Sequence, residues 1–267
     1  MKKNFSLILF LILSLTLSLI ACNKKGKEDT SLKDIKSKRK FVIGLDDSFP
    51  PMGFKNNKGE IVGFDIDLAK EVAKRMNLEV EFKPVEWDGV VLSLNNKDID
   101  VIWNGLTITK DREKQINFSK PYLENKQVIV VNKNSDIKNK FNLKNKKVAV
   151  QLGSSSENAL NLDKKTADSL KELKKYSNNT EALMDLQSKR VDAVVVDEVV
   201  ARYYISKKTN IFNILDDDFG KQSYGIGFRK SDSTFKNEVN KTLDEIIKDG
   251  TAKKISEKWF GQSIIKK

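Results

Sequence analysis

Apolar runs of strand length alternate along the chain with segments whose apolar positions follow helical spacing. In the clearest helical segment, apolar side chains recur at three- and four-residue steps, the pattern of a helix with one buried face. Acidic residues and prolines follow the first apolar run, and Pro84 ends the second. The order strand, helix, strand, helix, strand predicts an α/β fold with a largely parallel sheet. Strands are expected at residues 41–45, 80–82 and 99–103, and helices at residues 65–76 and 90–95.

A second unit of the same kind follows. Residues 97–102 and 189–194 have similar local sequences where a helix passes into an apolar strand, so the second half of the chain echoes the first. A polar residue lies beyond each strand, Asn104 in the first and Asp197 in the second. Because ligands of open α/β sheets collect at the carboxyl ends of strands, two such ends facing one another would form a cleft. Further strands are expected at residues 146–150, 191–196, 211–215 and 224–228, and helices around Leu183 and Leu186 and at residues 199–205, 235–247 and 252–260.

The polar segment after the first of these strand ends has the composition of a binding loop. Asn104 and Gly105 break the strand, and Thr107 and Thr109 offer hydroxyl groups. Arg112 follows where a helix begins, and its planar guanidinium presents a fork of donors that suits a carboxylate. Arginine is scarce among the 49 basic residues, so its use here favours guanidinium geometry over charge alone.

The composition restricts the possible chemistry. A chain of 267 residues can form one large domain or two lobes, and 39% hydrophobic with 32% charged residues is typical of a globular protein. The sequence has no histidine, which removes the commonest metal ligand and general base, and its single cysteine allows neither an intrachain disulfide nor a zinc cluster. We therefore expect no metal, no cofactor and no catalytic triad.

The net charge of +12 is concentrated near the N-terminus. Residues 1–40 contain ten basic and three acidic side chains, which account for +7, so only +5 is spread over the rest of the chain. The sequence shows no arginine cluster and no stripe of interleaved aromatic and basic residues. A nucleic-acid-binding surface is therefore not expected.

The N-terminus has the features of an export signal. Two lysines precede residues 5–20, an almost uninterrupted apolar segment that is shorter than the about 20 residues of a membrane-spanning helix. The segment ends at Ala21-Cys22 and resembles the lipobox of bacterial lipoproteins, in which the leader is cut before a cysteine that receives a diacylglyceryl group. We expect a lipoprotein signal peptide at residues 1–21 and a lipidated Cys22, with a solvated, flexible tether through residue 40. The alternative is a cytoplasmic protein with an uncleaved anchor and an incidental cysteine.

Four short motifs, in this order, resemble a known family. Each is weak alone, but the ordered set is highly specific. The motifs are GFDIDLA at residues 63–69, NGLTIT at residues 104–109 with Arg112, FSKPY at residues 118–122, and GSS at residues 153–155. From about Lys40 to Gly261 the chain is similar to the extracytoplasmic solute-binding proteins (family 3) of polar amino acid ABC transporters and to the related ligand domains of ionotropic glutamate receptors.

The resemblance implies the two-lobed, type II periplasmic-binding-protein fold. Each lobe would have a central, mostly parallel sheet flanked by helices, with the ligand cleft between the lobes. Lobe 1 is expected to comprise residues 41–126 and 223–267, and lobe 2 residues 127–222. Because no low-complexity linker separates the lobes, we expect stiff crossovers that permit hinge motion.

The resemblance also implies how an amino acid would be held. Arg112 would grip the α-carboxylate, aided by the backbone around Gly105 and Thr107 and by serines of the opposite lobe. Asp197 would receive the α-ammonium group. The residues expected to line the site are Asp46, Phe49, Trp87, Asn104, Gly105, Thr107, Arg112, Ser154, Ser155, Ser156 and Asp197.

Selectivity would depend on the residues near the ligand side chain. Phe49 and Trp87 would flank it, Asp46 matches a position that can meet a polar or cationic group, and Ser156 is a further candidate. This set suggests arginine, lysine, glutamine or a similarly long polar side chain, with cystine still possible.

Several of these residues also have ordinary structural explanations. Arg112 could be a surface arginine that pairs with Asp111 or Glu113. Phe49 and Trp87 could be core residues, as buried aromatics usually are.

The candidates in lobe 2 have structural explanations of their own. Ser154 and Glu157 have the spacing of a capping box, which is compatible with ligand binding because a helix N-terminus with spare donors also binds carboxylates. Asp197 could instead cap the helix that begins at the next residue. In lobe 1, Asp46 could simply end a strand.

These inferences predict a lipid-anchored, extracytoplasmic receptor. It would close on one polar or basic L-amino acid and deliver it, as a monomer and without covalent chemistry, to a membrane permease and its ATPase. One alternative is an enzyme on the same scaffold, dehydratase- or transglycosylase-like, because carboxylate chemistry needs no histidine. Another is a sensory ligand-binding domain, although such domains usually precede a membrane-spanning helix.

Overall fold

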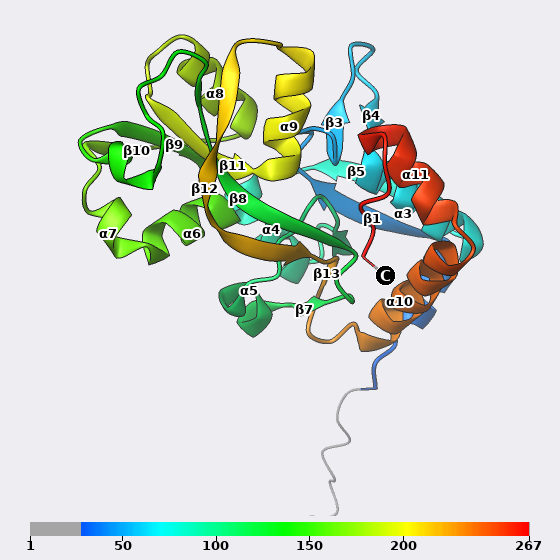
Figure 1. Cartoon of the computed structure of the whole chain (residues 1–267). Helices are drawn as coiled ribbons and strands as arrows, with labels where there is room; N and C mark the ends of the chain where they lie inside the picture. The colour runs from blue at the N-terminus through cyan, green and yellow to red at the C-terminus, as the bar shows by residue number, and fades with distance from the viewer. Residues whose placement is uncertain (1–27, 267) are drawn as a thin grey trace, which may run out of the picture.

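The computed structural model describes residues 28–266 and contains two lobes, each built on a five-stranded sheet (Figure 1). We define lobe 1 as the part around the sheet with strand order β5-β1-β6-β13-β7. Its sheet strands are β1 (Lys40–Leu45), β5 (Glu79–Pro84), β6 (Val101–Ile102), β7 (Asn117–Phe118) and β13 (Gly227–Phe228), and a small second sheet holds β2 (Ser48–Phe49), β3 (Gly53–Lys55) and β4 (Ile61–Val62). Its helices are α2 (Ser31–Lys38), α3 (Phe64–Arg75), the 3-10 helix η1 (Trp87–Gly89), α4 (Val90–Asn95), α5 (Lys110–Gln115), α10 (Ser233–Lys248) and α11 (Thr251–Phe260).

Lobe 2 surrounds the sheet with strand order β10-β9-β11-β8-β12. Its strands are β8 (Leu123–Asn132), β9 (Lys147–Gln151), β10 (Glu172–Tyr176), β11 (Ala193–Asp197) and β12 (Phe212–Tyr224). Its helices are the 3-10 helix η2 (Lys140–Leu143), α6 (Ser155–Leu162), α7 (Lys164–Ala167), α8 (Asn179–Gln187) and α9 (Glu198–Lys207). The two-lobed α/β fold expected from the sequence is confirmed.

Each sheet has the same mixture of strand directions. In lobe 1, β5, β1 and β6 pair in parallel and β13 pairs antiparallel with its neighbours. In lobe 2, β10, β9 and β11 pair in parallel, and β8 runs against both β11 and β12. In each sheet one strand, β13 in lobe 1 and β8 in lobe 2, therefore runs antiparallel to the other four. The carboxyl ends of the four parallel strands of each lobe lie at the same edge of its sheet.

The similar sequences at residues 97–102 and 189–194 fold in the same way. Lys97 and Lys189 follow helices α4 and α8 with φ angles of 66° and 58°, which turns the chain toward the next strand. Three residues further on, Asp100 and Asp192 each accept a hydrogen bond from a backbone N–H of the first strand of their unit, at 2.9 and 2.7 Å. The predicted echo between the two halves is confirmed at this passage.

Two long antiparallel strands, β8 and β12, run from lobe 2 toward lobe 1 (Figure 1). At the end nearest lobe 1, Leu123 pairs with Tyr224, and Tyr224 also forms an isolated bridge with Thr107. The lobe boundaries predicted at residues 126 and 223 fall inside or at the end of these strands and remain a prediction.

Some predicted elements differ from the structure. The strand expected at residues 99–103 is only β6, and the strand expected at residues 211–215 continues to residue 224 as β12. The strand expected at residues 224–228 is divided between the end of β12 and β13. The strands β2, β3, β4 and β7, of two or three residues each, were not predicted. The longer strands β8 and β10 were not predicted either, because their apolar runs lie among charged residues without a distinct turn signal.

The flexible tether predicted through residue 40 is wrong for its last part. Residues 31–38 form α2, in which Ile35 is only 3% exposed and Leu32 packs against the core. The helix was missed because it has only these two apolar side chains on one face among charged residues. The predicted signal peptide and Cys22 lie outside the described residues. No helix within residues 28–266 is both long enough and apolar enough to cross a membrane.

Candidate functional site

The two lobes touch one another where the carboxyl ends of their strands meet. The Thr107 and Ser155 hydroxyl oxygens lie 2.9 Å apart, and Arg112 Nη2 donates to the Gly153 carbonyl at 3.2 Å. A third contact joins the Gln151 amide and the Asp46 carboxylate across the same cleft, as described below. The structure is therefore that of the closed pair of lobes, with candidate site residues from both lobes in contact.

The turn after β6 is held from within lobe 1. Gly105 has a φ of 58°, and a Cβ at this position would lie 2.8 Å from the Phe49 ring, so the close turn requires glycine. The Gly105 N–H donates to Asp65 Oδ2 at 2.7 Å, and Asn104 Oδ1 accepts from the Asp46 N–H at 3.1 Å. These polar groups of Asn104 and Gly105 shape the turn that presents Thr107.

Arg112 lies in the first turn of α5, which Thr109 caps by accepting a hydrogen bond from the Arg112 N–H. Its Nη1 donates to the Thr107 carbonyl at 3.0 Å, and its guanidinium carbon lies 5.8 Å from the centre of the Trp87 ring. Burial lowers the pKa of Arg112 to about 10, and the Asp197 carboxylate opposes that shift. Within residues 28–266 no ion pair joins Arg112 to the acids that flank it in sequence, so the predicted alternative of a surface ion pair does not hold.

The N-terminus of α6 faces Arg112 from lobe 2. Ser154 Oγ accepts from the Glu157 N–H, and Glu157 Oε2 accepts from the Gly153 N–H, which is a slightly shifted form of the predicted capping box. The N–H groups of Ser155 and Ser156 have no hydrogen-bond partner among the described residues. Such N–H groups at a helix start are donors for an anion.

Asp197 ends β11 and is 4% exposed. Its Oδ1 accepts hydrogen bonds from Asn125, Gln127 and Tyr224 at 2.5, 2.8 and 2.8 Å. It makes no capping hydrogen bond to α9, so the capping interpretation is wrong. Burial raises the pKa of Asp197, and these three donors and the Arg112 charge oppose that rise.

Asp46 and Trp87 line one cavity, and Phe49 lies against Gly105. Asp46 Oδ1 accepts from the Ser48 N–H and hydroxyl, Oδ2 accepts from Gln151 Nε2 at 2.7 Å, and burial raises the Asp46 pKa. Phe49 and Trp87 are 6% and 8% exposed, so both are also packed as core residues. A cavity of about 440 Å³, lined by residues of both lobes, adjoins Asp46 and Trp87.

This cavity is acidic. Its charged lining residues, among those that the structure describes, are Asp46, Asp47, Glu86 and Glu181. Asp47 is paired with Lys55 at 2.5 Å on the outer side. The cavity therefore offers carboxylates to any part of a bound molecule that extends beyond Asp46.

Four residues of the site were not predicted. Gln151 bridges the lobes through Asp46, Gln127 contacts Asp197 and two serines, and Asn125 and Tyr224 donate to Asp197. Gln151 could have been found because it is a polar residue at the end of a predicted strand. Gln127 and Tyr224 lie on the crossing strands, whose position next to the site has no local sequence signal.

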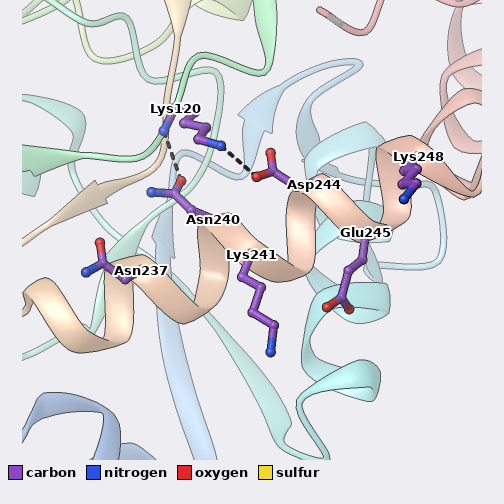
Figure 2. A pocket seen from close by; sticks show the side chains of 7 residues that line it. All are labelled: Lys120, Asn237, Asn240, Lys241, Asp244, Glu245 and Lys248. Atoms are coloured by element: carbon purple, nitrogen blue, oxygen red, sulfur yellow. Dashed lines mark hydrogen bonds and ion pairs between the residues drawn. The ribbon is translucent and has the colours of Figure 1, made fainter.

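A depression of about 420 Å³ beside α10 lies apart from this site (Figure 2). The Lys120 N–H donates to Asn240 Oδ1 at 2.9 Å, and Lys120 Nζ to Asp244 at 2.6 Å. These side chains serve as partners for one another and fasten the loop before β8 to α10. The depression shares no residue with the cleft between the lobes.

Comparison with known proteins agrees with this geometry. L-cystine-binding protein TcyJ of Escherichia coli (strain K12) is 32% identical over 245 residues, which is 91% of this chain and 91% of that protein. The crystal structure of an ABC uptake transporter substrate binding protein from Streptococcus pneumoniae with bound histidine is 33% identical and superposes with a TM-score of 0.87, covering 90% of this chain and 99% of that one. An ancestral arginine-binding protein bound to arginine is 46% identical with a TM-score of 0.78, covering 83% and 98%.

The family profile described as bacterial extracellular solute-binding proteins, family 3, matches residues 41–262, nearly the whole described chain. The paired lobes, the strand-end cleft and the match over this length lead to one conclusion: the chain belongs to family 3 of the bacterial extracellular solute-binding proteins.

Proposed function

We propose that this protein is the substrate-binding lipoprotein of an ABC importer, and that it captures a polar or basic L-amino acid by lobe closure and delivers it to the permease. The observation that carries the proposal is the pair formed by Arg112 and Asp197. The Arg112 guanidinium of lobe 1 donates to the Gly153 carbonyl at 3.2 Å, and the Asp197 carboxylate of lobe 2 is joined through Gln127 to Ser155, two residues further along the chain from Gly153. An α-amino acid carries the complementary pair of charges.

The α-carboxylate would lie between Arg112 and the first turn of α6. The unpartnered N–H groups of Ser155 and Ser156, together with the guanidinium, supply donors from opposite sides of the cleft. Charge-assisted hydrogen bonds of this kind contribute about 1.5–3 kcal/mol each. Because the donors belong to different lobes, a carboxylate bound to all of them stabilises the closed arrangement.

The α-ammonium would bind Asp197. Its Oδ1 already accepts three hydrogen bonds, and no partner within residues 28–266 is recorded for Oδ2. The three hydrogen bonds to Oδ1 thus hold the Asp197 carboxylate in one orientation, and Oδ2 can accept a hydrogen bond from the ligand. An ammonium there would also relieve the cost of a buried negative charge.

The acidic cavity next to Asp46 and Trp87 favours a cationic side chain. A ligand side chain that passes between Phe49 and Trp87 would reach Asp46 and then Glu86 and Glu181. The relatives described above bind cystine, histidine and arginine, so the family alone does not choose among these ligands. We propose arginine or lysine as the ligand, ahead of neutral glutamine.

Lipid attachment at Cys22 is part of the same proposal and depends on the sequence alone. It would keep the receptor at the outer face of the cell membrane, where an importer's permease lies. The proposal includes no enzymatic turnover, and the protein would act as a monomer.

The ligand can be tested by a thermal-shift screen of the common L-amino acids and citrulline on the chain beginning at Cys22. A ligand at a hundred times its Kd adds about 2.7 kcal/mol of stability. We expect arginine or lysine to raise the melting temperature and citrulline, the neutral isostere of arginine, to do so much less. A screen in which no amino acid changes the melting temperature would contradict the proposed function.

A further inference from the structure

One buried amide, Gln127, contacts both parts of the site that lobe 2 provides. It lies on β8, is 0% exposed, and is directly opposite Asp197 in the antiparallel register of β8 and β11. Its Nε2 donates to Asp197 Oδ1 at 2.8 Å and lies 3.1 Å from Ser155 Oγ. Its Oε1 accepts from the Ser156 hydroxyl at 2.5 Å. The amide therefore joins the end of β11 to the start of α6.

The orientation of this amide follows from its partners. Rotating it by half a turn would place its carbonyl oxygen against the Asp197 carboxylate and its NH₂ group against the Ser156 hydroxyl. In the observed orientation, Nε2 has two hydrogens for three acceptors, since Gln222 Oε1 is also 2.9 Å away. The charged acceptor holds its hydrogen most strongly, so the contact with Asp197 is the fixed one.

We infer that Gln127 is a positioning residue that sets the distance and orientation between Asp197 and the N-terminus of α6. These two groups would bind the two charges of one α-amino acid, whose separation is fixed by a single carbon atom. A small displacement of either group would therefore weaken both contacts. The inference rests on the proposed function, because it assigns Gln127 a role only if Asp197 and α6 hold the same ligand.

A purely structural role makes a different prediction. A buried glutamine with satisfied hydrogen bonds also stabilises the fold, and its removal would cost stability whatever the site binds. Asn132 provides the comparison, because it lies on the same strand and donates from Nδ2 to the Leu186 carbonyl at 2.6 Å, away from the cleft.

The first test is calorimetry with arginine on Gln127→Leu and Asn132→Leu. Both changes remove a hydrogen-bonded amide from β8, fully buried at Gln127 and half-buried at Asn132, so both should lower the melting temperature. Only Gln127→Leu should weaken the affinity, by about 10- to 100-fold, as when a group that orients a metal-ligating side chain is removed. Equal affinities for the two variants and the wild type would overturn the inference.

The second test uses Gln127→Glu and remains informative if the leucine variant does not fold. The introduced carboxyl faces Asp197 from β8, with Tyr224 from β12 and Arg112 from α5 as the other titratable or charged groups around that carboxylate. When ionised it repels Asp197, whereas its protonated form can donate to Asp197 as the amide does. The affinity of this variant relative to wild type should therefore rise about tenfold or more between pH 8 and pH 5.

A relative affinity that does not change with pH would overturn the positioning role. If wild type binds arginine normally and both glutamine variants match it, the inference fails and the proposed function stands. If wild type binds no amino acid, both fail.

Discussion

At the scale of single residues, the clearest feature outside the proposed ligand contacts is a buried carboxylate at the start of α3. Asp65 Oδ2 accepts from the Gly105 N–H and from the Tyr122 hydroxyl at 2.9 Å, which ties the binding turn to the start of β8. Asp65 Oδ1 and Trp103 Nε1 are both buried, and neither has a hydrogen-bond partner among residues 28–266. Burial raises the pKa of Asp65 to about 7, against the opposing effect of the donors from Gly105 and Tyr122.

We expect the free energy of unfolding without ligand to fall as the pH rises from 5 to 8. A raised carboxyl pKa gives stability that is complete below the unfolded value, here 3.8, and is lost as the pH passes the folded value of about 7. The loss from Asp65 should be about 1–3 kcal/mol over this range. The raised pKa values of Asp46 and Asp197 act in the same direction.

Urea unfolding of Asp65→Asn at several pH values checks this expectation. The variant should show a distinctly flatter pH dependence than wild type, because the titrating group is gone. Asp67→Asn, two residues further along α3, is the control and should keep the wild-type slope. An equal slope in wild type and Asp65→Asn would show that Asp65 does not titrate in this range.

The sequence predicted single residues well where a motif surrounds them. Arg112 and Ser154 were identified with their local roles, since a helix start or a cap is defined within a few residues. Gln127 and Asp65 were not assigned roles, because their partners are 28 to 95 residues away in one case and 40 to 57 in the other. Such contacts depend on strand pairing rather than on local sequence.

At the scale of elements, the start of the described chain is fastened to a helix near its other end. Asp29 Oδ2 accepts from the Thr234 N–H at 2.7 Å, and Oδ1 accepts from the Ser31 N–H and hydroxyl. Asp232, the residue at the cap position of α10, makes no capping hydrogen bond, so Asp29 supplies one from a distant part of the sequence. Although burial acts to raise it, the Asp29 pKa is lowered to about 2 by the hydrogen bonds from Ser31 and Thr234.

We expect Asp29→Ala to lower the free energy of unfolding by about 1 kcal/mol, the usual cost of losing a helix cap. Because the Asp29 pKa is lowered, this contribution is present above pH 3.8 and is lost as the pH falls through about 2. Urea unfolding at pH 7 measures it. Glu28→Ala removes an exposed charge one residue earlier and should be nearly neutral, so equal effects of the two changes would contradict the capping role.

The elements themselves were mostly predictable. Helices α3, α9, α10 and α11 have long one-faced patterns and agree with the sequence within a few residues. Helix α2 and strand β10 could not be found in this way, because their few apolar positions are buried by tertiary packing rather than by a periodic stripe.

At the scale of the whole molecule, closure brings the two lobes to backbone contact at Gly153. A Cβ added there would lie 2.7 Å from the Cα of Asp88 in lobe 1. Gly153 also has a φ of 70°, which favours glycine by itself. The closed arrangement therefore depends on the absence of a side chain at Gly153.

We expect Gly153→Ala to weaken amino acid affinity by about tenfold or more, because the 2.7 Å contact of the added Cβ with Asp88 Cα must be relieved by partial opening of the lobes. Small-angle scattering with saturating ligand should then show a larger radius of gyration than for liganded wild type. Gly59→Ala is the matched control, with a φ of 79° and no atom of residues 28–266 within 4 Å of an added Cβ. Gly59→Ala should lower the free energy of unfolding through backbone strain and leave the amino acid affinity unchanged. If Gly59→Ala and Gly153→Ala lose affinity equally, the loss comes from backbone strain and not from the contact between the lobes.

The two-lobed architecture was predictable from the strand and helix order together with the family motifs. The contacts between the closed lobes were not predictable, because residues such as Gly153 and Asp88 come together only in the folded chain. Their positions relative to each other depend on the crossing strands, of which only part of β12 was predicted.

The central claim, that this cleft holds the α-carboxylate of an amino acid on Arg112, is tested most directly by calorimetry on Arg112→Ala and Arg112→Lys. Loss of two charge-assisted hydrogen bonds should weaken the affinity for arginine about 100-fold or more in Arg112→Ala, with little change in melting temperature. Arg112→Lys keeps the positive charge but loses the planar pair of donors, so its affinity for arginine should lie between those of wild type and Arg112→Ala. An unchanged affinity in Arg112→Ala would contradict the claim.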